Sequence, residues 1–176
     1  MKIRTSQLTI DAMLAAMCAV LGYVALDAGQ FKITFESLPV LFAALMYGPV
    51  DGMLVGGIGT FIYQFLRYGF SATTALWILP YIVCGLVAGL YSKHFTFNNN
   101  RKQLLFIVVL SELLIFVFNT LAIYVDSKVY GYYSYAYVWG AIGLRFVIAV
   151  IKSVIFGLVT PGILKRMSRI THNGGR

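Results

Sequence analysis

Hydrophobic residues follow one another in long blocks along this chain, separated by short polar or glycine-rich segments. The blocks do not alternate with polar residues as the strands of a β-barrel would, and they lack the polar face of a soluble amphipathic helix. Most of them approach the length of about 20 residues that an apolar helix needs to cross a bilayer. The pattern therefore predicts an all-α integral membrane protein that forms a single domain over residues 1–176.

Turn signals divide the apolar blocks into six predicted transmembrane helices. These helices are expected at residues 8–26, 35–47, 50–67, 75–91, 103–126 and 138–165. Ser37 is the expected N-cap of the second helix, because Pro39 follows in its first turn. The segment 48–52, Gly-Pro-Val-Asp-Gly, is expected to form the tight turn before the third helix. Residues 27–34 are expected to form an outer loop.

Positive charge lies mainly at the two ends of the chain and in one loop, so its placement matters more than the formal net charge of +8. The basic residues of these segments are Lys2, Arg4, Lys93, Arg101, Lys102, Lys165, Arg166, Arg169 and Arg176. Segments rich in Lys and Arg beside membrane spans face the cytoplasm. The pattern predicts cytoplasmic N- and C-termini, a cytoplasmic 92–102 loop and an even number of spans in a plasma membrane. The expected partner of this charge is the lipid bilayer, and no nucleic acid is implied.

An arginine inside the last apolar block, Arg145, follows a loop rich in tyrosine and tryptophan. Aromatic residues with a polar group are typical both of a membrane interface and of a site that stacks on a flat ligand, and both interpretations remain open. An unpaired guanidinium within the membrane costs about 2.5–3.5 kcal/mol. Arg145 therefore either reaches the interface, pairs with a carboxylate such as Asp126, or is the counter-ion of an anionic solute.

Other polar and aromatic residues are expected on the same outer side of the membrane. Gln64 and Arg67 lie one turn apart at the end of the third helix, where Arg67 is either an interfacial residue or a second holder of a carboxylate. The candidate binding residues are Arg145, Arg67, Gln64, Tyr63, Glu36, Trp77, Asn119, Lys128, Tyr133 and Trp139. Their layout indicates a binding protein that opens to the outside.

Motifs of enzymes and metal sites are missing from the sequence. It contains no G-x-x-x-x-G-K-[ST] phosphate-binding loop, no H-E-x-x-H, no G-x-S-x-G and no clustered cysteine and histidine residues. Cys18 and Cys84 each lie in an apolar run and are expected to be buried free thiols. We expect neither an enzyme nor a metal or cofactor site, and any energy for transport must come from a partner. A structural membrane protein and an intramembrane enzyme are the alternatives from other classes.

Small residues recur at intervals of four along the first helix, where Ala12 precedes Ala16 and Ala15 precedes Ala19. Such spacing allows a second helix to approach closely within a membrane, although alanine is also common in spans that make no such contact.

Three long segments resemble the S component of an energy-coupling factor (ECF) vitamin transporter. They read FKITFESLPVLFAALMYGPVDGMLVGGIGTFIYQFL, TTALWILPYIVCGLVAGLYSK and NTLAIYVDSKVYGYYSYAYVWGAIGLR. With the first helix, the resemblance extends over residues 9–165, and the later segments are most similar to the folate family. It implies a six-helix subunit that captures a vitamin from outside a bacterial cell, with folate expected and riboflavin or thiamine as alternatives.

The resemblance also implies partners. Members of this family dock through their first helices on a transmembrane coupling (T) subunit carried by two cytosolic ABC-type ATPases, and they topple in the membrane to release the vitamin. On this basis Ala12, Ala15, Ala16 and Ala19 are the expected docking surface.

Folate suits the candidate residues chemically. Its pterin and benzoyl rings can stack on tyrosine and tryptophan, and its two carboxylates suit Arg145, Arg67 or Lys128. The amino and amide edge of the pterin could be bound by acceptors or amides, for which Glu36, Gln64 and Asn119 are the candidates.

Overall fold

The computed structural model describes residues 5–28, 31–94 and 101–173, which are mostly helical. The helices are α1 Thr5–Tyr23, α2 Ser37–Tyr47, α3 Pro49–Tyr68, α4 Thr74–His94, α5 Arg101–Val129, α6 Tyr135–Val138 and α7 Ile142–Asn173. Each predicted helix corresponds to one of the longer helices, which confirms the all-helical class. Within the described residues, α1, α4, α5 and the segment Tyr135–Leu164 are long and apolar enough to cross a membrane.

Two elements differ from the prediction. The predicted loop at 27–34 contains a short antiparallel hairpin, β1 Leu26–Ala28 with β2 Phe31–Ile33, in which Asp27 is opposite Lys32. Strands of three residues are too short to produce a readable alternation in the sequence. The sixth helix was predicted to begin at residue 138, but α7 begins at Ile142, after a turn at residues 139–141, and the short helix α6 lies mostly within the predicted loop.

The predicted N-cap of α2 is also wrong. Glu36 occupies the N-cap position and makes no capping hydrogen bond with its side chain. The Ser37 hydroxyl instead donates to the carboxylate of Glu112 on α5, at 2.6 Å. A buried carboxylate is the stronger acceptor, so the hydroxyl contributes to the interior of the bundle and not to the helix end.

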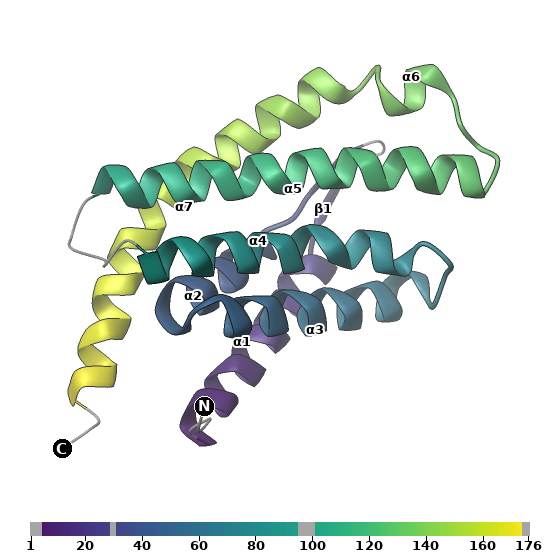
Figure 1. The fold of residues 1–176 in the computed structure, drawn as a ribbon. Helices are drawn as coiled ribbons and strands as arrows, with labels where there is room; N and C mark the ends of the chain where they lie inside the picture. The colour runs from purple at the N-terminus through teal and green to yellow at the C-terminus, as the bar shows by residue number, and fades with distance from the viewer. Residues whose placement is uncertain (1–4, 29–30, 95–100, 174–176) are drawn as a thin grey trace.

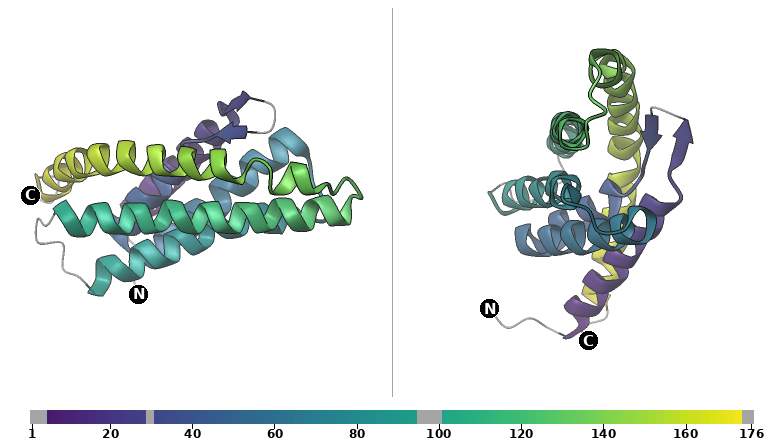
Figure 2. Two further views of the ribbon diagram at one scale, coloured as in Figure 1. Left: turned by 90° about the horizontal axis from the view of Figure 1, so that it is seen from above. Right: turned by 90° about the vertical axis from the view of Figure 1, so that its right-hand side faces the viewer.

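The helices form a bundle in which α3, α4 and α5 lie roughly side by side, with α1 and α7 running obliquely across them (Figures 1 and 2). The turns that join α3 to α4 and α5 to α6 lie at one end of the bundle (Figure 1). The beginning of α1 and the end of α7 lie away from that end. Lys2, Arg4 and Arg176, on which the predicted sidedness partly depends, lie outside the described residues.

Glycines allow α3 to pack directly against its neighbours. A Cβ atom at Gly56 would lie 2.6 Å from the backbone oxygen of Tyr81 on α4, and one at Gly59 would lie 2.6 Å from Cβ of Cys18 on α1. Gly85 of α4 similarly abuts the backbone of Gly52. In lipid, helix association depends on such close packing, because the lipid tails are as apolar as the helices. The α3–α4 and α1–α3 contacts are the most extensive in the bundle.

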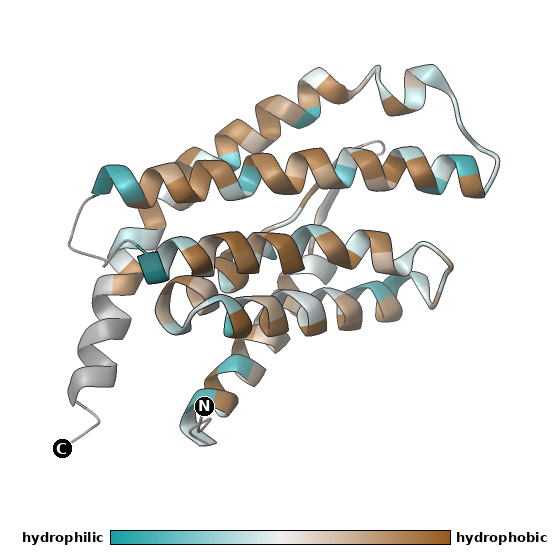
Figure 3. Ribbon diagram, in the orientation of Figure 1, coloured by the Kyte–Doolittle hydropathy of each residue, from teal (hydrophilic) through white to brown (hydrophobic). Residues whose placement is uncertain are grey.

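Hydrophobic residues predominate along the long helices (Figure 3). Large side chains such as Leu66, Leu158 and Phe106 are more than half exposed, as expected for residues that contact lipid. The interior is packed around α2, with Val40, Leu41 and Ala43 fully buried. Cys18 and Cys84 are buried free thiols, as predicted.

Candidate functional site: a polar cavity inside the bundle

A cavity of about 480 Å³ lies between α3, α4, α5 and α7, with residues that precede α2 in its wall. Its volume is within the range of about 300–1,000 Å³ that is typical of sites for small molecules. The polar and aromatic residues of the wall are Thr34, Glu36, Tyr63, Gln64, Tyr68, Ser71, Thr73, Trp77, Tyr81, Glu112, Phe116, Asn119, Thr120, Asp126, Tyr132, Tyr137, Arg145 and Lys152. So many hydrogen-bonding groups inside an apolar bundle indicate a site for a polar solute.

One face of α5 forms the longest side of the cavity. The lining residues of α5 extend from Glu112 to Asp126 at intervals of one or three residues, as expected for a single helical face. At a rise of 1.5 Å per residue, this face is about 21 Å long. The cavity therefore suits an elongated ligand that lies along α5.

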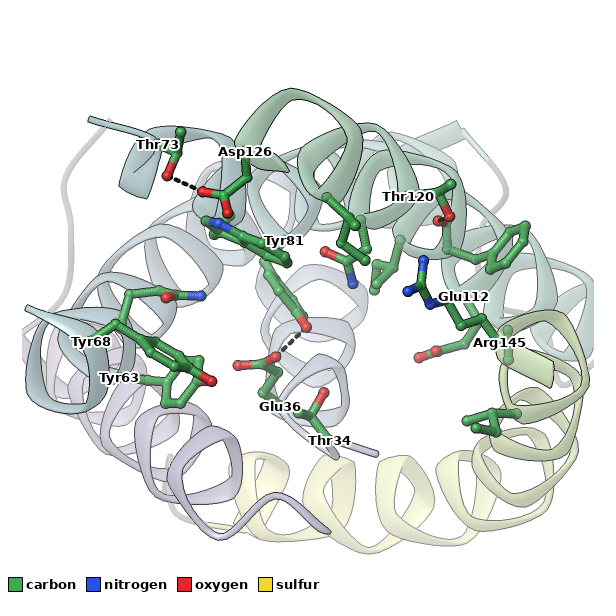
Figure 4. A pocket seen from close by; sticks show the side chains of 18 of the residues that line it. Thr34, Glu36, Tyr63, Tyr68, Thr73, Tyr81, Glu112, Thr120, Asp126 and Arg145 are labelled. Carbon is green, nitrogen blue, oxygen red and sulfur yellow. Dashed lines mark hydrogen bonds between the residues drawn. The ribbon is translucent and has the colours of Figure 1, made fainter. Parts of the chain in front are cut away.

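Glu36 forms the polar contact between the start of α2 and α4. The Tyr81 hydroxyl donates a hydrogen bond to its carboxylate, and both residues are buried. Figure 4 shows this pair inside the cavity, with Tyr63 on one side and Arg145 approaching from the other. Tyr63 is almost completely buried, so its aromatic ring is held by packing. The carboxylate of Glu36 is thus positioned to accept a hydrogen bond from a donor group of a ligand.

Arg145 provides positive charge in the cavity wall. Its guanidinium donates to the backbone oxygens of Val138 and Tyr137, each at 3.3 Å, which fixes the turn between α6 and α7. No carboxylate among the side chains that the structure describes forms an ion pair with it. The suggested pairing with Asp126 is not formed, because that carboxylate is bound elsewhere. Two long backbone contacts leave guanidinium donors for an anionic group in the cavity.

Asp126 joins the two loops at one end of the bundle. It accepts hydrogen bonds from Thr73, just before α4, and from Tyr132, just after α5. Burial and the hydrogen bond to Asp126 raise the pKa of Tyr132, so its phenol remains a donor at neutral pH. All three residues line the cavity. The contacts therefore hold the two loops together at this end of the site.

Lys152 and Glu112 form an ion pair in the wall, with Nζ and Oε2 3.0 Å apart. The pair joins α7 to α5, and the hydrogen bond from Ser37 joins both to α2. Both side chains are at most 10% exposed.

The structure brings some of the predicted binding residues together and leaves others outside the wall. Those in the wall are Glu36, Tyr63, Gln64, Trp77, Asn119 and Arg145. Arg67 lies outside it, because its guanidinium donates to the backbone oxygen of Tyr23 at 2.9 Å. Lys128 also lies outside and is 4.0 Å from the ring centre of Tyr133. Tyr133 and Trp139 pack against Tyr124, and neither lines the cavity.

The predicted docking face of α1 is divided by the packing. Ala12 and Ala16 are exposed beside Met13 and Met17, whereas Ala15 and Ala19 are buried. The backbone oxygen of Ala15 lies close to Gly59 of α3. The second alanine register therefore serves contacts within the chain.

Several wall residues were not among the sequence candidates, and Lys152, Tyr81 and Asp126 matter most. Lys152 and Glu112 carry a readable signal, because each is a charged residue within an apolar block. Tyr81 carries none, because hydroxyl residues are common on every face of a membrane helix. Thr34 and Thr73 carry none either, because they lie in segments between helices, where hydroxyl residues are common. The described part of the chain holds no group of three His, Cys, Asp or Glu residues that could bind a metal.

Fold and cavity together define a helical membrane protein with an internal site for a small polar molecule. The family model described as "ECF transporter, substrate-specific component" matches residues 6–167. The chain therefore belongs to the family of ECF transporter substrate-specific components, which are multi-pass proteins of the bacterial plasma membrane. Such a component is a transport subunit and not an enzyme.

Other known proteins are similar over all or part of the chain. A solved structure described as "Structure and mechanism of the S component of a bacterial ECF transporter" matches with a TM-score of 0.65 and 20% identity, over 92% of this chain and 97% of that one. Two UPF0397 proteins, from Lactobacillus gasseri and Lactobacillus johnsonii, are 43% and 39% identical over 70 residues. These residues are 40% of this chain and 36% of the length of either relative.

Proposed function

We propose that this protein captures folate from outside the cell and delivers it inward as the substrate-binding subunit of an ATP-driven ECF importer. The observation that carries the proposal is that Arg145, aromatic residues and hydrogen-bond acceptors all line one elongated cavity. A carboxylate of the glutamate tail would bind the guanidinium, and the pterin amino and amide donors would face Glu36. Tyr63 and Trp77 line the same cavity and would contact the rings.

The proposed partners are a transmembrane coupling subunit and two cytosolic ATPases, since the sequence has no phosphate-binding loop of its own. We propose six spans with both termini cytoplasmic, and delivery of the vitamin by toppling of the bundle on the coupling subunit. In this cycle folate would bind at the end of the bundle where Asp126 holds the two loops together. The coupling subunit would dock on the side of α1 that exposes Ala12 and Ala16.

Titration of tryptophan fluorescence tests the folate assignment. The chain has two tryptophans, Trp77 in the cavity wall and Trp139 outside it. In a Trp139→Phe variant the signal comes from Trp77 alone, and folate should quench it at submicromolar concentration, whereas riboflavin and thiamine should not compete. Quenching by another vitamin in place of folate would retain the transport role and refute the substrate.

Replacing Ala16 by tryptophan should weaken assembly with the coupling subunit without changing folate affinity. The bulky ring would keep the exposed face of α1 from close helix contact, while it points away from the cavity. Co-purification of the coupling subunit measures assembly. Val117→Trp, at an exposed position on α5, is the matched control. Normal assembly of the Ala16 variant would exclude this face as the docking surface.

A further inference from the structure

The ion pair between Lys152 and Glu112 has hydrogen-bonding capacity that the protein does not use. An ammonium group carries three N–H donors. In the part of the chain that the structure describes, Glu112 is its hydrogen-bonding partner, and the ring of Phe156 lies 5.6 Å away. The Lys152 side chain is 10% exposed and lines the cavity, so its remaining donors can be satisfied from the cavity side.

Unsatisfied donors on a buried charge are costly, so an acceptor atom of a bound molecule would be stabilised there. The charge of Lys152 is already balanced by Glu112, whose oxygen is 3.0 Å from Nζ. A second anion beside this carboxylate would be repelled, whereas a neutral carbonyl oxygen or ring nitrogen would not. The chemistry of the pair therefore favours a neutral acceptor.

Lys152 lies at a different position along the cavity from Arg145, the proposed site for the anionic group. Lys152 follows Arg145 by seven residues on α7, and both line the cavity. Seven residues of helix extend about 10 Å, so one elongated ligand can contact both side chains through different groups. Ser37 holds Glu112, and the adjacent Glu36 offers a carboxylate acceptor in the same cavity. Donors from Lys152 and an acceptor at Glu36 together match an edge that carries both a carbonyl and N–H groups.

We infer that Lys152, fixed by Glu112, is a specificity-determining residue that binds the carbonyl or ring-nitrogen edge of a flat heterocycle, while Arg145 binds the anionic group. The inference rests on the proposed function and extends it by orienting the ligand. The heterocycle lies toward Lys152, and the carboxylate lies toward Arg145.

The test compares ligand fragments on a variant that removes both charges. Lys152→Met alone would leave Glu112 buried and unpaired, so the variant is Lys152→Met with Glu112→Gln, in which the amide still accepts from Ser37. Calorimetric titration uses folate, 6-hydroxymethylpterin, which has no carboxylate, and p-aminobenzoylglutamate, which has no heterocycle. Lys102→Met, exposed at the start of α5, is the control.

The double variant should bind folate and 6-hydroxymethylpterin about 10- to 100-fold more weakly and p-aminobenzoylglutamate unchanged. Arg145→Gln should show the reverse selectivity between the two fragments. Unchanged affinities in the double variant, or a loss confined to p-aminobenzoylglutamate, would overturn the inference.

Failure of the folate proposal would give a different result, because the wild-type protein itself would not bind folate. If the wild type then binds riboflavin, the inference is decided by whether the double variant loses that binding. A wild type that binds no vitamin would overturn both the inference and the proposed function.

Discussion

Replacement of Arg145 by glutamine will lower the affinity of the purified protein for folate by at least about 100-fold. The guanidinium is the positive charge in the cavity wall that no carboxylate of the described residues neutralises. The turn between α6 and α7 also has backbone hydrogen bonds, from Gly140 to Ala136 and from Ile142 to Trp139, that do not depend on the side chain, so it should persist. Calorimetric titration with folate measures the effect.

Two further variants show whether the loss of folate affinity comes from the guanidinium of Arg145. Arg145→Lys keeps the charge but not the planar pair of donors, so its affinity should lie between those of the wild type and the glutamine variant. Arg101→Gln, exposed at the start of α5, should bind folate normally. If Arg145→Gln elutes as a folded protein and retains full affinity, the guanidinium does not hold the ligand.

Replacement of Gly56 by alanine will strongly destabilise the protein, by several kcal/mol, whereas the same change at Gly57 will have little effect. A methyl group at Gly56 would meet the backbone oxygen of Tyr81 at 2.6 Å, and backbone atoms of two packed helices cannot give way locally. At Gly57 the nearest atoms are the flexible end of Ile82, at 3.4 Å. Thermal unfolding in detergent compares the two variants.

The Gly56 variant should also bind ligand poorly where it folds. Separation of α3 from α4 would move Tyr81, whose hydroxyl holds the carboxylate of Glu36 in the cavity. Equal melting temperatures for the two variants would show that the close α3–α4 contact is not required for stability.

The helical class was predictable because the apolar blocks are long, and their breaks coincide with glycine, proline and polar residues. The later start of α7, at Ile142, was not predicted, because Gly140 is one of many glycines in apolar blocks and most of the others are helical. The hairpin before α2 was missed for a different reason. Its strands depend on pairing with each other, not on a pattern that each carries alone.

Arg145 and Asn119 could be predicted as site residues because a polar residue deep in a span usually faces the interior of the bundle or a cavity. Lys128, Tyr133 and Trp139 had the same chemistry, but they lie near helix ends, where sequence spacing does not decide which way a side chain faces. The wall position of Lys152 depends on Glu112, which is 40 residues earlier in the chain. A pairing at that distance follows from how α5 and α7 pack, which the sequence alone does not determine.

Mass spectrometry of the small molecules released on denaturing the purified protein tests the central claim most directly. The protein should be expressed in bacteria supplied with folate, purified in detergent and analysed beside the Arg145→Gln variant. Folate bound near one molecule per chain in the wild type, and absent from the variant, is the predicted result. A wild type that releases a different vitamin, or equal amounts of folate from both proteins, would contradict the account.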